Sequence, residues 1–230
     1  ALLPTTRESF GWTTQFASLL GSANLLGYLI GAFWAMRLPQ TRIMTFYIQA
    51  SAFAGMFSLM SCAFAGFSDV WYIFWRVISG ISGGLIMILS PSIVAQCSEL
   101  QDRFKINFIG FSGIGIGVLL ATLFLPHLDQ ISTRSAWLIL SSFAFCICIV
   151  LSVLLQGFKP LLATQQTLSS SKSETDLLFF SLIAVYGCSA FAYVPHSLFW
   201  IDYLTKILKL DLFWMNFNWT LYGLGSALGA

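Results

Sequence analysis

The stretch VWYIFWRVISGISGGLIMILSPSIVAQ, residues 70–96, decides the fold. Its length exceeds the roughly 20 mostly apolar residues that a helix needs to cross the hydrocarbon core of a bilayer. Arg76 is its one charged residue, and Gly80, Gly83 and Gly84 follow it at helical spacing. Helices and closed barrels are the structures that satisfy their backbone hydrogen bonds inside lipid. The stretch therefore predicts a membrane-spanning α-helix that carries a cation.

Similar apolar runs lie on both sides of this stretch. They occupy residues 13–36, 43–66, 106–126, 137–155 and 177–203, and a further run begins at residue 212. Barrel strands alternate in polarity over about 10 residues, whereas these runs are longer and evenly apolar. Connections as short as residues 67–69 require neighbouring helices to be antiparallel. The fold class predicted is all-α, a polytopic transmembrane helix bundle.

The composition supports a membrane protein and excludes several other classes. Hydrophobic residues make up 57% of the chain and charged residues 9%, whereas a soluble domain carries about 25% charged residues. The net charge of +2 forms no basic stripe, so no nucleic-acid partner is expected. The cysteines are read as small apolar residues, and neither a metal nor a cofactor is predicted. The expected partners are the lipid bilayer and a small-molecule substrate.

A polar segment divides the apolar runs into two groups. Residues 156–176 contain the sequence SSSKSE and are typical of a flexible linker. Residues 1–4 are interpreted as the end of a preceding helix and residues 5–11 as a loop. The predicted organisation is an N-terminal six-helix half at 1–155 with a truncated first helix, a linker at 156–176, and the start of a truncated C-terminal half at 177–230. The sequence is therefore expected to be part of a longer protein.

Lysine and arginine residues in the loops predict the orientation in the membrane, because cytoplasmic loops carry an excess of them. One side receives Arg37, Arg42, Arg103, Lys105, Lys159 and Lys172. The other side receives Arg7, Arg134, Lys206 and Lys209. This weak bias places the 156–176 linker in the cytoplasm.

Short motifs spread over nearly the whole chain suggest a family. They are Leu2-Leu3-Pro4, Gly11-Trp12, ANLLGYLIGA at residues 23–32, Arg76-Val77-Ile78-Ser79-Gly80, Gly113-Ile114-Gly115-Ile116-Gly117, Trp137, and Tyr186-Gly187 followed by Ala192-Tyr193. Together they resemble the major facilitator superfamily, and within it the bacterial YbfB/YjiJ-type branch. The resemblance implies a major facilitator fold and secondary transport of a small solute by alternating access. It also implies a monomeric permease of the bacterial inner membrane without enzymatic activity.

The sequence departs from the usual pattern of the superfamily in two places. After Gly31 the loop keeps Arg37 and Arg42 but lacks the acidic residue that usually accompanies such basic residues. The glycine-rich run near Gly113 lacks the Gly-Pro pair typical of drug/proton antiporters. These departures weaken the expectation of an antiporter.

Arg76 is the strongest candidate for a functional residue. A charged side chain at the centre of a spanning helix costs about 2.5–3.5 kcal/mol on insertion scales and needs a partner, a water-filled cavity or a route to the interface. One interpretation is a side chain that extends to the outer interface. The other is a cation in a cavity, where it pairs with an anionic substrate or a carboxylate. The resemblance favours the cavity, because members of the superfamily carry a functional arginine here.

Other polar side chains within the apolar runs are candidates for a substrate or proton path. Asn24 and Tyr28 lie one helical turn apart, and either line such a path or bond to a neighbouring helix. Tyr193 and His196 form a polar stripe beside Pro195, which interrupts the helical hydrogen bonds. His196 could titrate near neutral pH and carry a proton, so proton coupling is left open.

Glycines at helical spacing predict close helix packing, because small residues allow membrane helices to approach one another. They are Gly27 and Gly31, then Gly80, Gly83 and Gly84, and finally Gly113 and Gly117.

The sequence also allows two alternatives to a transporter. The Gly-x-Ser-Gly patterns around Ser82 and Ser112 resemble the nucleophile motif of rhomboid-type intramembrane serine proteases, with His196 as a base. The repetition of the pattern weakens both matches. A membrane scaffold without transport activity is the other alternative, and it would use the buried polar groups in packing alone.

Overall fold

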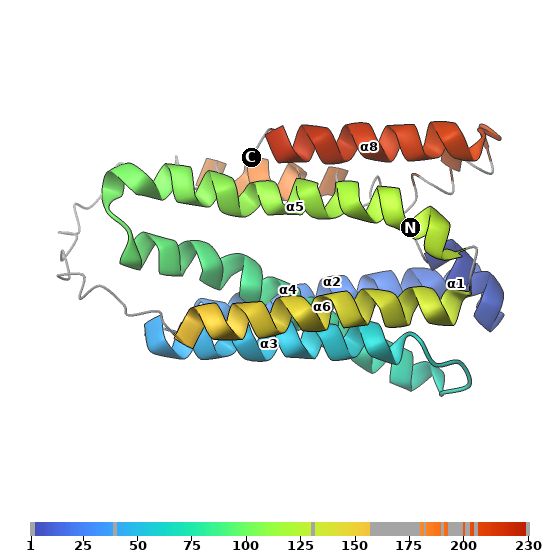
Figure 1. Ribbon diagram of the computed structural model, residues 1–230, viewed down its shortest axis with the longest axis horizontal. Coiled ribbons are helices and arrows are strands. Elements are labelled where there is room, and N and C mark those ends of the chain that lie inside the picture. The colour runs from blue at the N-terminus through green and yellow to red at the C-terminus, as the bar shows by residue number, and fades with distance from the viewer. Residues whose placement is uncertain are drawn as a thin grey trace. The chain divides into compact units, whose positions relative to one another are not determined.

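The computed structural model describes residues 3–38, 41–129, 132–156, 180–181, 183–189, 191–192, 200, 203–204 and 207–228. Its described helices are α1 (Leu3–Phe10), α2 (Thr14–Ala35), α3 (Thr41–Ser61), α4 (Asp69–Cys97), α5 (Leu100–Asp129), α6 (Thr133–Gln156) and α8 (Leu212–Leu228) (Figure 1). No strand occurs within these ranges. The predicted all-α fold class is confirmed.

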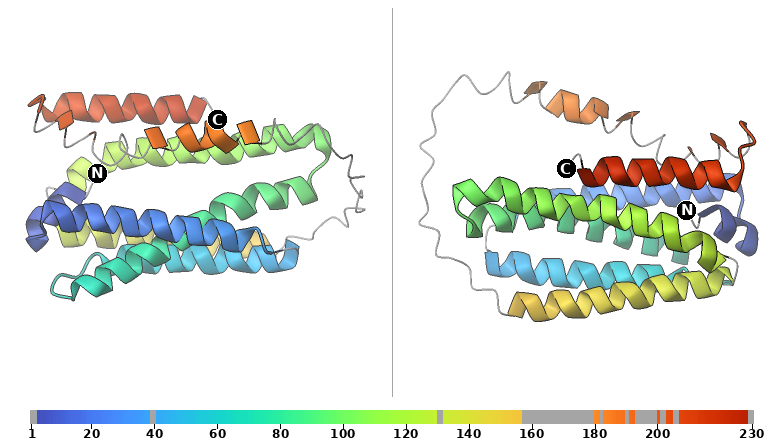
Figure 2. Two further views of the ribbon diagram at one scale, coloured as in Figure 1. Left: turned by 180° about the vertical axis from the view of Figure 1, so that it is seen from behind. Right: turned by 45° about the horizontal axis from the view of Figure 1, so that its top comes forward.

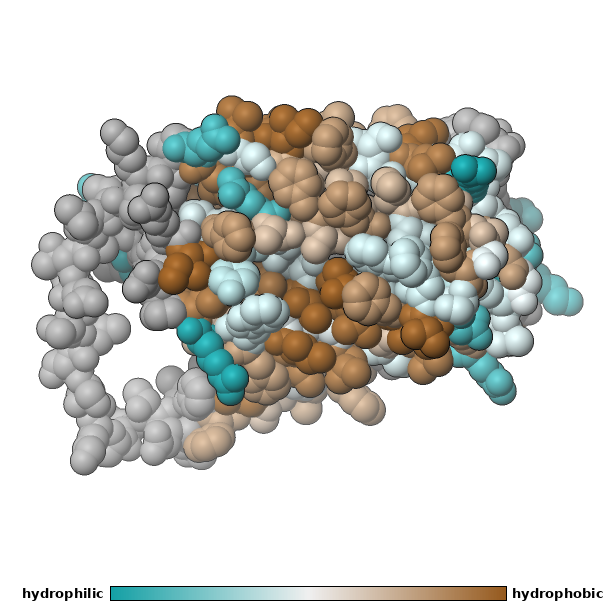
Figure 3. Space-filling model, turned by 90° about the horizontal axis from the view of Figure 1, so that it is seen from below, coloured by the Kyte–Doolittle hydropathy of each residue, from teal (hydrophilic) through white to brown (hydrophobic). Residues whose placement is uncertain are grey.

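Among the described residues, five helices are long and apolar enough to cross a membrane. Their spans are Thr14–Ala35, Ile43–Ser61, Asp69–Val94, Gln101–Ala121 and Thr133–Gln156, and each overlaps a run predicted from the sequence. On one face of the molecule, hydrophobic residues cover the middle and hydrophilic residues gather toward the two ends (Figure 3). This distribution suits a protein that spans a lipid layer.

The chain divides into two compact units. One unit comprises Ala1–Ala163 with Tyr222–Ala230, and the other comprises Thr164–Leu221. The predicted boundaries of the linker fall in a part of the chain that lies mostly outside the described residues, so the division into 1–155, 156–176 and 177–230 stays a prediction. The first unit holds α1 to α6, which carry the candidate site.

Helix α4 is the central element of the first unit. It packs extensively against α2 and α3, and α3 in turn packs against α6. The side-by-side arrangement of α3 and α6 is visible from two directions (Figures 1 and 2). Helix α5 makes few contacts with α4 and α6. In the apolar stretch that could cross the membrane, 6% is buried inside the protein for α5, compared with 33% for α4.

Two clusters of buried apolar side chains hold these helices together. The larger joins α2, α3 and α4, and consists of Ala35, Met44, Ile48, Leu85, Leu89 and Ile93. The smaller joins the end of α3 to the start of α6, and consists of Cys62, Ala63, Ala136 and Trp137. The second cluster lies beside the candidate site.

The loop predicted at residues 5–11 is wrong, because α1 forms a helix over most of it. Helix α1 ends at Phe10, and it is followed by Gly11, whose φ of +67° lies in the left-handed region that favours glycine. Thr13 then begins α2, where its side-chain Oγ1 accepts a hydrogen bond from the backbone N–H of Phe16 at 3.2 Å. The short α1 matters for the site because it carries Thr6.

Candidate functional site

The crossing of α2 and α4 is a contact between two helix backbones. On α2, Gly27 lies against the backbone of Val77, and Gly31 lies against the backbone of Ile81. A Cβ atom added at Gly27 would lie 3.0 Å from the Cα of Val77, and one added at Gly31 would lie 2.9 Å from the Cα of Ile81. Real Cβ atoms essentially never come closer than 3.0 Å to such atoms. Any side chain at these two glycines would therefore have to push the helices apart.

The glycines of α4 meet α2 in the same way. A Cβ atom added at Gly80 would lie 2.7 Å from the backbone nitrogen of Tyr28, and it would also collide with the backbone of Asn24. At Gly84 the added atom would lie 3.0 Å from the nitrogen of Ala32. Gly83 differs, because its added Cβ would be 3.7 Å from the ring of Tyr28, which is an ordinary contact. Apart from Gly83, the glycines of both helices thus lie where a Cβ atom would be too close to the facing backbone.

The same crossing brings two of the predicted polar residues to α4. Asn24 is half-buried, and Tyr28 is 39% exposed. Neither side chain forms a hydrogen bond with another described residue. The structure thus places both residues beside the crossing, and their role in a substrate path stays a prediction.

Arg76 lies one helical turn before Gly80 and within the spanning part of α4. Its side chain is half-buried, and its guanidinium carbon Cζ lies 5.6 Å from the centre of the Trp137 ring on α6. Within the described residues, the guanidinium forms neither an ion pair nor a hydrogen bond. A cation within about 6 Å of an indole face is attracted by the negative face of the ring. Helix α4 therefore meets α2 at Gly80 and directs the Arg76 cation toward α6.

Trp137 is fixed in place behind the cation. Its side chain is 6% exposed, and its indole Nε1–H donates a hydrogen bond to the Oγ1 of Thr6 at 2.9 Å. The hydroxyl groups of Ser9 and Thr133 form a second hydrogen bond between α1 and α6 at 2.6 Å. Two hydrogen bonds thus hold α1 against the start of α6, beside the ring that faces Arg76.

Aromatic side chains cover the helix face between Arg76 and the start of α4. Tyr72 lies one turn before Arg76 on the same face and is 3% exposed. Its ring packs edge-on against Trp12 at 4.9 Å between ring centroids, and its hydroxyl donates to the carbonyl of Phe64 at 2.6 Å. The ring of Phe10 lies 6.1 Å from that of Tyr72. The position one turn before Arg76 on this face is therefore occupied by a buried tyrosine that packs against two other aromatic rings.

Comparison with protein families decides what class of protein carries this site. The family described as "Uncharacterised MFS-type transporter YbfB" matches the chain over residues 1–230, where MFS is the major facilitator superfamily. The chain belongs to this family. It is accordingly a member of the major facilitator superfamily, and its apolar helices are those of an integral membrane protein.

A curated relative of this MFS-type chain is a "Glucose transport protein" of Synechocystis sp. (strain ATCC 27184 / PCC 6803 / Kazusa). The two are 29% identical over 138 residues, which is 57% of the chain and 29% of the relative. The chain therefore matches less than a third of that relative's length. No solved structure matches the chain.

The two serines that suggested a protease are engaged within their own helices. The hydroxyl of Ser82 donates to the carbonyl of Ile78 at 2.8 Å, and the side chain is 4% exposed. The hydroxyl of Ser112 donates to the carbonyl of Ile109 at 2.8 Å. Both bonds are typical of a serine in a membrane helix, and membership of an MFS-type family points away from the protease.

Several predicted residues of this MFS-type chain are not brought to the site. Tyr193 and His196 lie outside the described residues. On α5, a Cβ atom added at Gly113 or at Gly117 would meet no heavy atom of a described residue within 4 Å. The packing role predicted for these two glycines stays a prediction. Among the described residues, no group of His, Cys, Asp and Glu could hold a metal ion.

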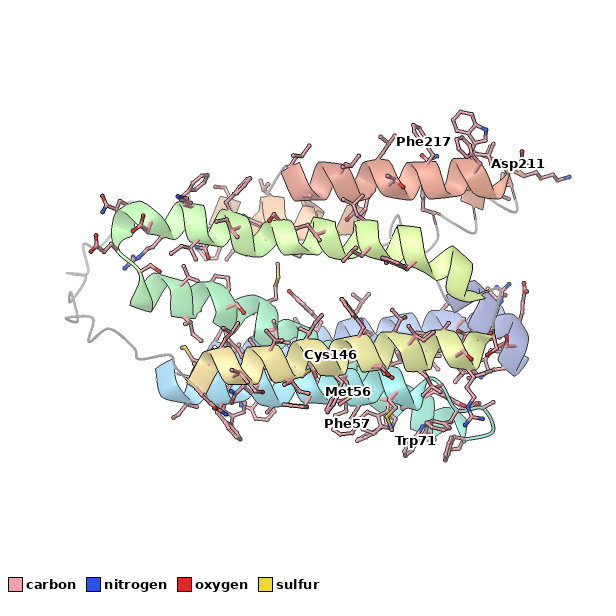
Figure 4. All side chains as sticks on the ribbon, viewed as in Figure 1. Met56, Phe57, Trp71, Cys146, Asp211 and Phe217 are labelled. Carbon is pink, nitrogen blue, oxygen red and sulfur yellow. The ribbon has the colours of Figure 1, made fainter. Side chains whose placement is uncertain are left out.

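Sequence reasoning missed the two residues that accompany Arg76. Trp137 was noted only as part of the family resemblance, and Thr6 was placed in a loop. A tryptophan at the start of an apolar run signals an aromatic ring near the interface, but nothing in the sequence pairs it with an arginine on another helix. The buried indole N–H groups of Trp71 and Trp75 were also missed, and they have no partner in the described part of the chain. Trp71 lies at the N-terminal end of α4 (Figure 4).

Proposed function

We propose that this MFS-type chain is part of a secondary active transporter that moves a small solute by alternating access. In this proposal Arg76, Asn24 and Tyr28 line the path of the solute. The observation that carries the proposal is the half-buried Arg76 within the spanning part of α4. A charge at this depth is costly unless a polar cavity or a partner compensates for it.

The surroundings of Arg76 support a cavity over an extended side chain that reaches the interface. An extended side chain would have to pass Tyr72, which is packed against Trp12 and Phe10. The guanidinium instead lies over Trp137, where none of its nitrogens is buried without a partner. Asn24 and Tyr28 add neutral polar groups at the neighbouring crossing. Together these groups supply a cation and hydrogen-bonding groups, and no acidic residue in the described part of the chain forms an ion pair with the cation.

The charge of Arg76 limits the chemistry of its partner. It favours an anionic group on the solute, or a carboxylate of the protein that loses and regains a proton. Tyr193 and His196 are proposed to complete the path, with His196 as a proton carrier if transport is proton-coupled. The relative's name makes glucose the first neutral solute to test beside small organic anions. We place the monomeric protein in the bacterial inner membrane.

The test measures solute uptake by the full-length protein in proteoliposomes. The solute is first chosen by a thermal-shift screen of glucose, other hexoses and small organic anions. Arg76→Gln should abolish uptake because the positive charge is lost. Arg76→Lys should keep part of the activity if charge alone matters, since lysine lacks the planar fork of the guanidinium.

Arg134→Gln is the matched control for this experiment. Arg134 is exposed, and its Cζ lies 5.3 Å from the centre of the Phe64 ring, so it is also an arginine over an aromatic ring. Its replacement should leave uptake unchanged. Full uptake by Arg76→Gln at equal protein level would overturn the proposed role of Arg76.

The proposed topology places the 156–176 linker in the cytoplasm. A single cysteine introduced by Ser170→Cys in a cysteine-free background should be inaccessible to a membrane-impermeant thiol reagent in intact cells, and accessible after permeabilisation. Labelling of intact cells would reverse the topology.

A further inference from the structure

Arg76 and Trp137 form a cation–π pair, in which the positive charge of the arginine can still bind an anion. The Cζ atom lies 5.6 Å from the ring centre, within the range of a cation–π contact. The attraction acts between the positive charge and the ring, so it does not neutralise the charge. Among the described residues no hydrogen-bond acceptor occupies the five N–H donors of the arginine. A carboxylate partner, by contrast, would occupy those donors and cancel the charge.

Among the described residues, the contact with Trp137 is the main interaction that stabilises the charge of Arg76. No acidic residue of the described ranges forms an ion pair with Arg76. Asp69, at the start of α4, is exposed and lies nearly two turns away along the helix. Among the described residues, the ring of Trp137 is therefore the group that lies over the guanidinium.

Trp137 can hold the guanidinium in place because the ring itself is held. It belongs to the buried cluster with Cys62, Ala63 and Ala136, and its indole N–H donates to Thr6. The Thr6 side chain is 1% exposed, so this hydrogen bond is shielded from solvent. The chain of contacts runs from Thr6 of α1 through Trp137 of α6 to Arg76 of α4.

We propose that Trp137 is a positioning residue for Arg76, and that Thr6 fixes the plane of its ring. The indole face orients the guanidinium so that its donors point at the anionic partner of the transport path. This inference rests on the proposed function of Arg76. It adds that affinity for that partner depends on a neutral aromatic residue of a different helix.

The first test is spectroscopic and needs no solute. The full-length protein is labelled with ¹⁵N-arginine, and the Nε–Hε signal of Arg76 is assigned by its loss in Arg76→Lys. The ring current of the indole should shift the Arg76 Hε signal upfield. The shift should disappear in Trp137→Leu, remain in part in Trp137→Phe, and weaken in Thr6→Val, which removes the hydrogen-bond acceptor at similar size.

Trp34→Leu is the control for the spectra. Trp34 lies near the C-terminal end of α2 and packs against Tyr47, at 5.5 Å between ring centroids. Its replacement should leave the Arg76 signal unchanged. An Arg76 signal at the same position in the wild type and in Trp137→Leu would overturn the contact, and with it the inference.

The second test separates affinity from turnover, using the solute found in the proteoliposome screen. Trp137→Leu should raise KM about three- to twentyfold, which corresponds to the range of cation–π contacts, while kcat changes less. Trp137→Phe should restore most of the affinity. A purely structural role would lower the amount of folded protein without this separation.

The outcomes distinguish the two proposals. If Arg76→Gln transports normally, the proposed role of Arg76 fails, whatever the spectra show. If Arg76→Gln is inactive while Trp137→Leu keeps the wild-type KM, the role of Arg76 stands and the positioning role of Trp137 fails.

Discussion

The glycines of the α2–α4 crossing and two glycines of α5, Gly113 and Gly117, carry the same sequence signal and have different surroundings. At the crossing, an added Cβ at Gly27, Gly31 or Gly80 would collide with backbone atoms of the facing helix. On α5, an added Cβ at Gly113 or Gly117 would meet no described atom within 4 Å. Small residues at helical spacing therefore do not by themselves imply a close contact.

The difference lies in the facing helix. Helices α2 and α4 each carry glycines at the level where the other does, so each backbone can enter the surface of the other. Glycine inside a helix costs about 1 kcal/mol relative to alanine, and a tight backbone contact offsets this cost. Gly115 of α5 has such a facing helix, because an added Cβ there would lie 2.5 Å from the Cα of Ala227 on α8. A glycine stripe predicts close packing when two helices have matching stripes.

The largest expected effect comes from a bulky side chain at the crossing. Gly80→Leu should lower the free energy of unfolding by about 3 kcal/mol or more, because even its Cβ would collide with the backbone of Asn24 and Tyr28. Gly113→Leu, the matched change on α5, should not lower it and should raise it by up to about 1 kcal/mol, because leucine favours the helix and the site has open space. Thermal unfolding of both purified variants in the same detergent measures the comparison. Equal losses would mean that the α5 stripe is also packed.

Adding a methyl group should change the free energy of unfolding in opposite directions at the α2–α4 crossing and on α5. Gly31→Ala should lower the free energy of unfolding by about 1–3 kcal/mol, because the added Cβ lies 2.9 Å from the Cα of Ile81. Gly117→Ala should raise it by up to about 1 kcal/mol, since alanine favours the helix and finds open space. Paired melting curves test the signs. A stabilised Gly31→Ala variant would show that the crossing can widen without loss.

The smallest effect on the free energy of unfolding is expected at Gly83, which can be compared with Gly84 of the same helix. Its added Cβ would lie 3.7 Å from Cδ2 of the Tyr28 ring, which is an ordinary van der Waals distance. Gly83→Ala should therefore change the free energy of unfolding by less than about 1 kcal/mol, with helix propensity favouring the variant. The neighbouring Gly84→Ala is the control and should be destabilised, since its Cβ would lie 3.0 Å from the backbone nitrogen of Ala32. Similar losses in both variants would contradict the stated geometry.

The spanning helices could be predicted because bilayer thickness sets the length of an apolar run. Hydropathy reports the part of a helix that lies in lipid, so it misses polar helical turns. Helix α5 begins at Leu100, whereas its apolar run was placed from residue 106, because the first turns carry Asp102, Arg103 and Lys105. Helix α1 was missed for the same reason, since a short polar helix has no apolar run.

The candidate site could be predicted only in part. Arg76, Asn24 and Tyr28 stand out because a polar group in an apolar run is energetically costly. Their neighbours do not stand out. The contact of Trp137 with Arg76 and its hydrogen bond to Thr6 join helices that are far apart in the chain, and only tertiary packing brings them together.

The backbone contact between α2 and α4 has a consequence for genetics. A harmful substitution is often rescued by a second one that trims the opposing side chain. At residues 27 and 31 the opposing atoms belong to the main chain of Val77 and Ile81, which no substitution can shorten. At residue 83 the opposing atom belongs to the Tyr28 ring, which a smaller residue would remove. Selection for second-site suppressors should therefore rescue large residues at position 83, whereas at positions 27 and 31 it should recover mainly true revertants.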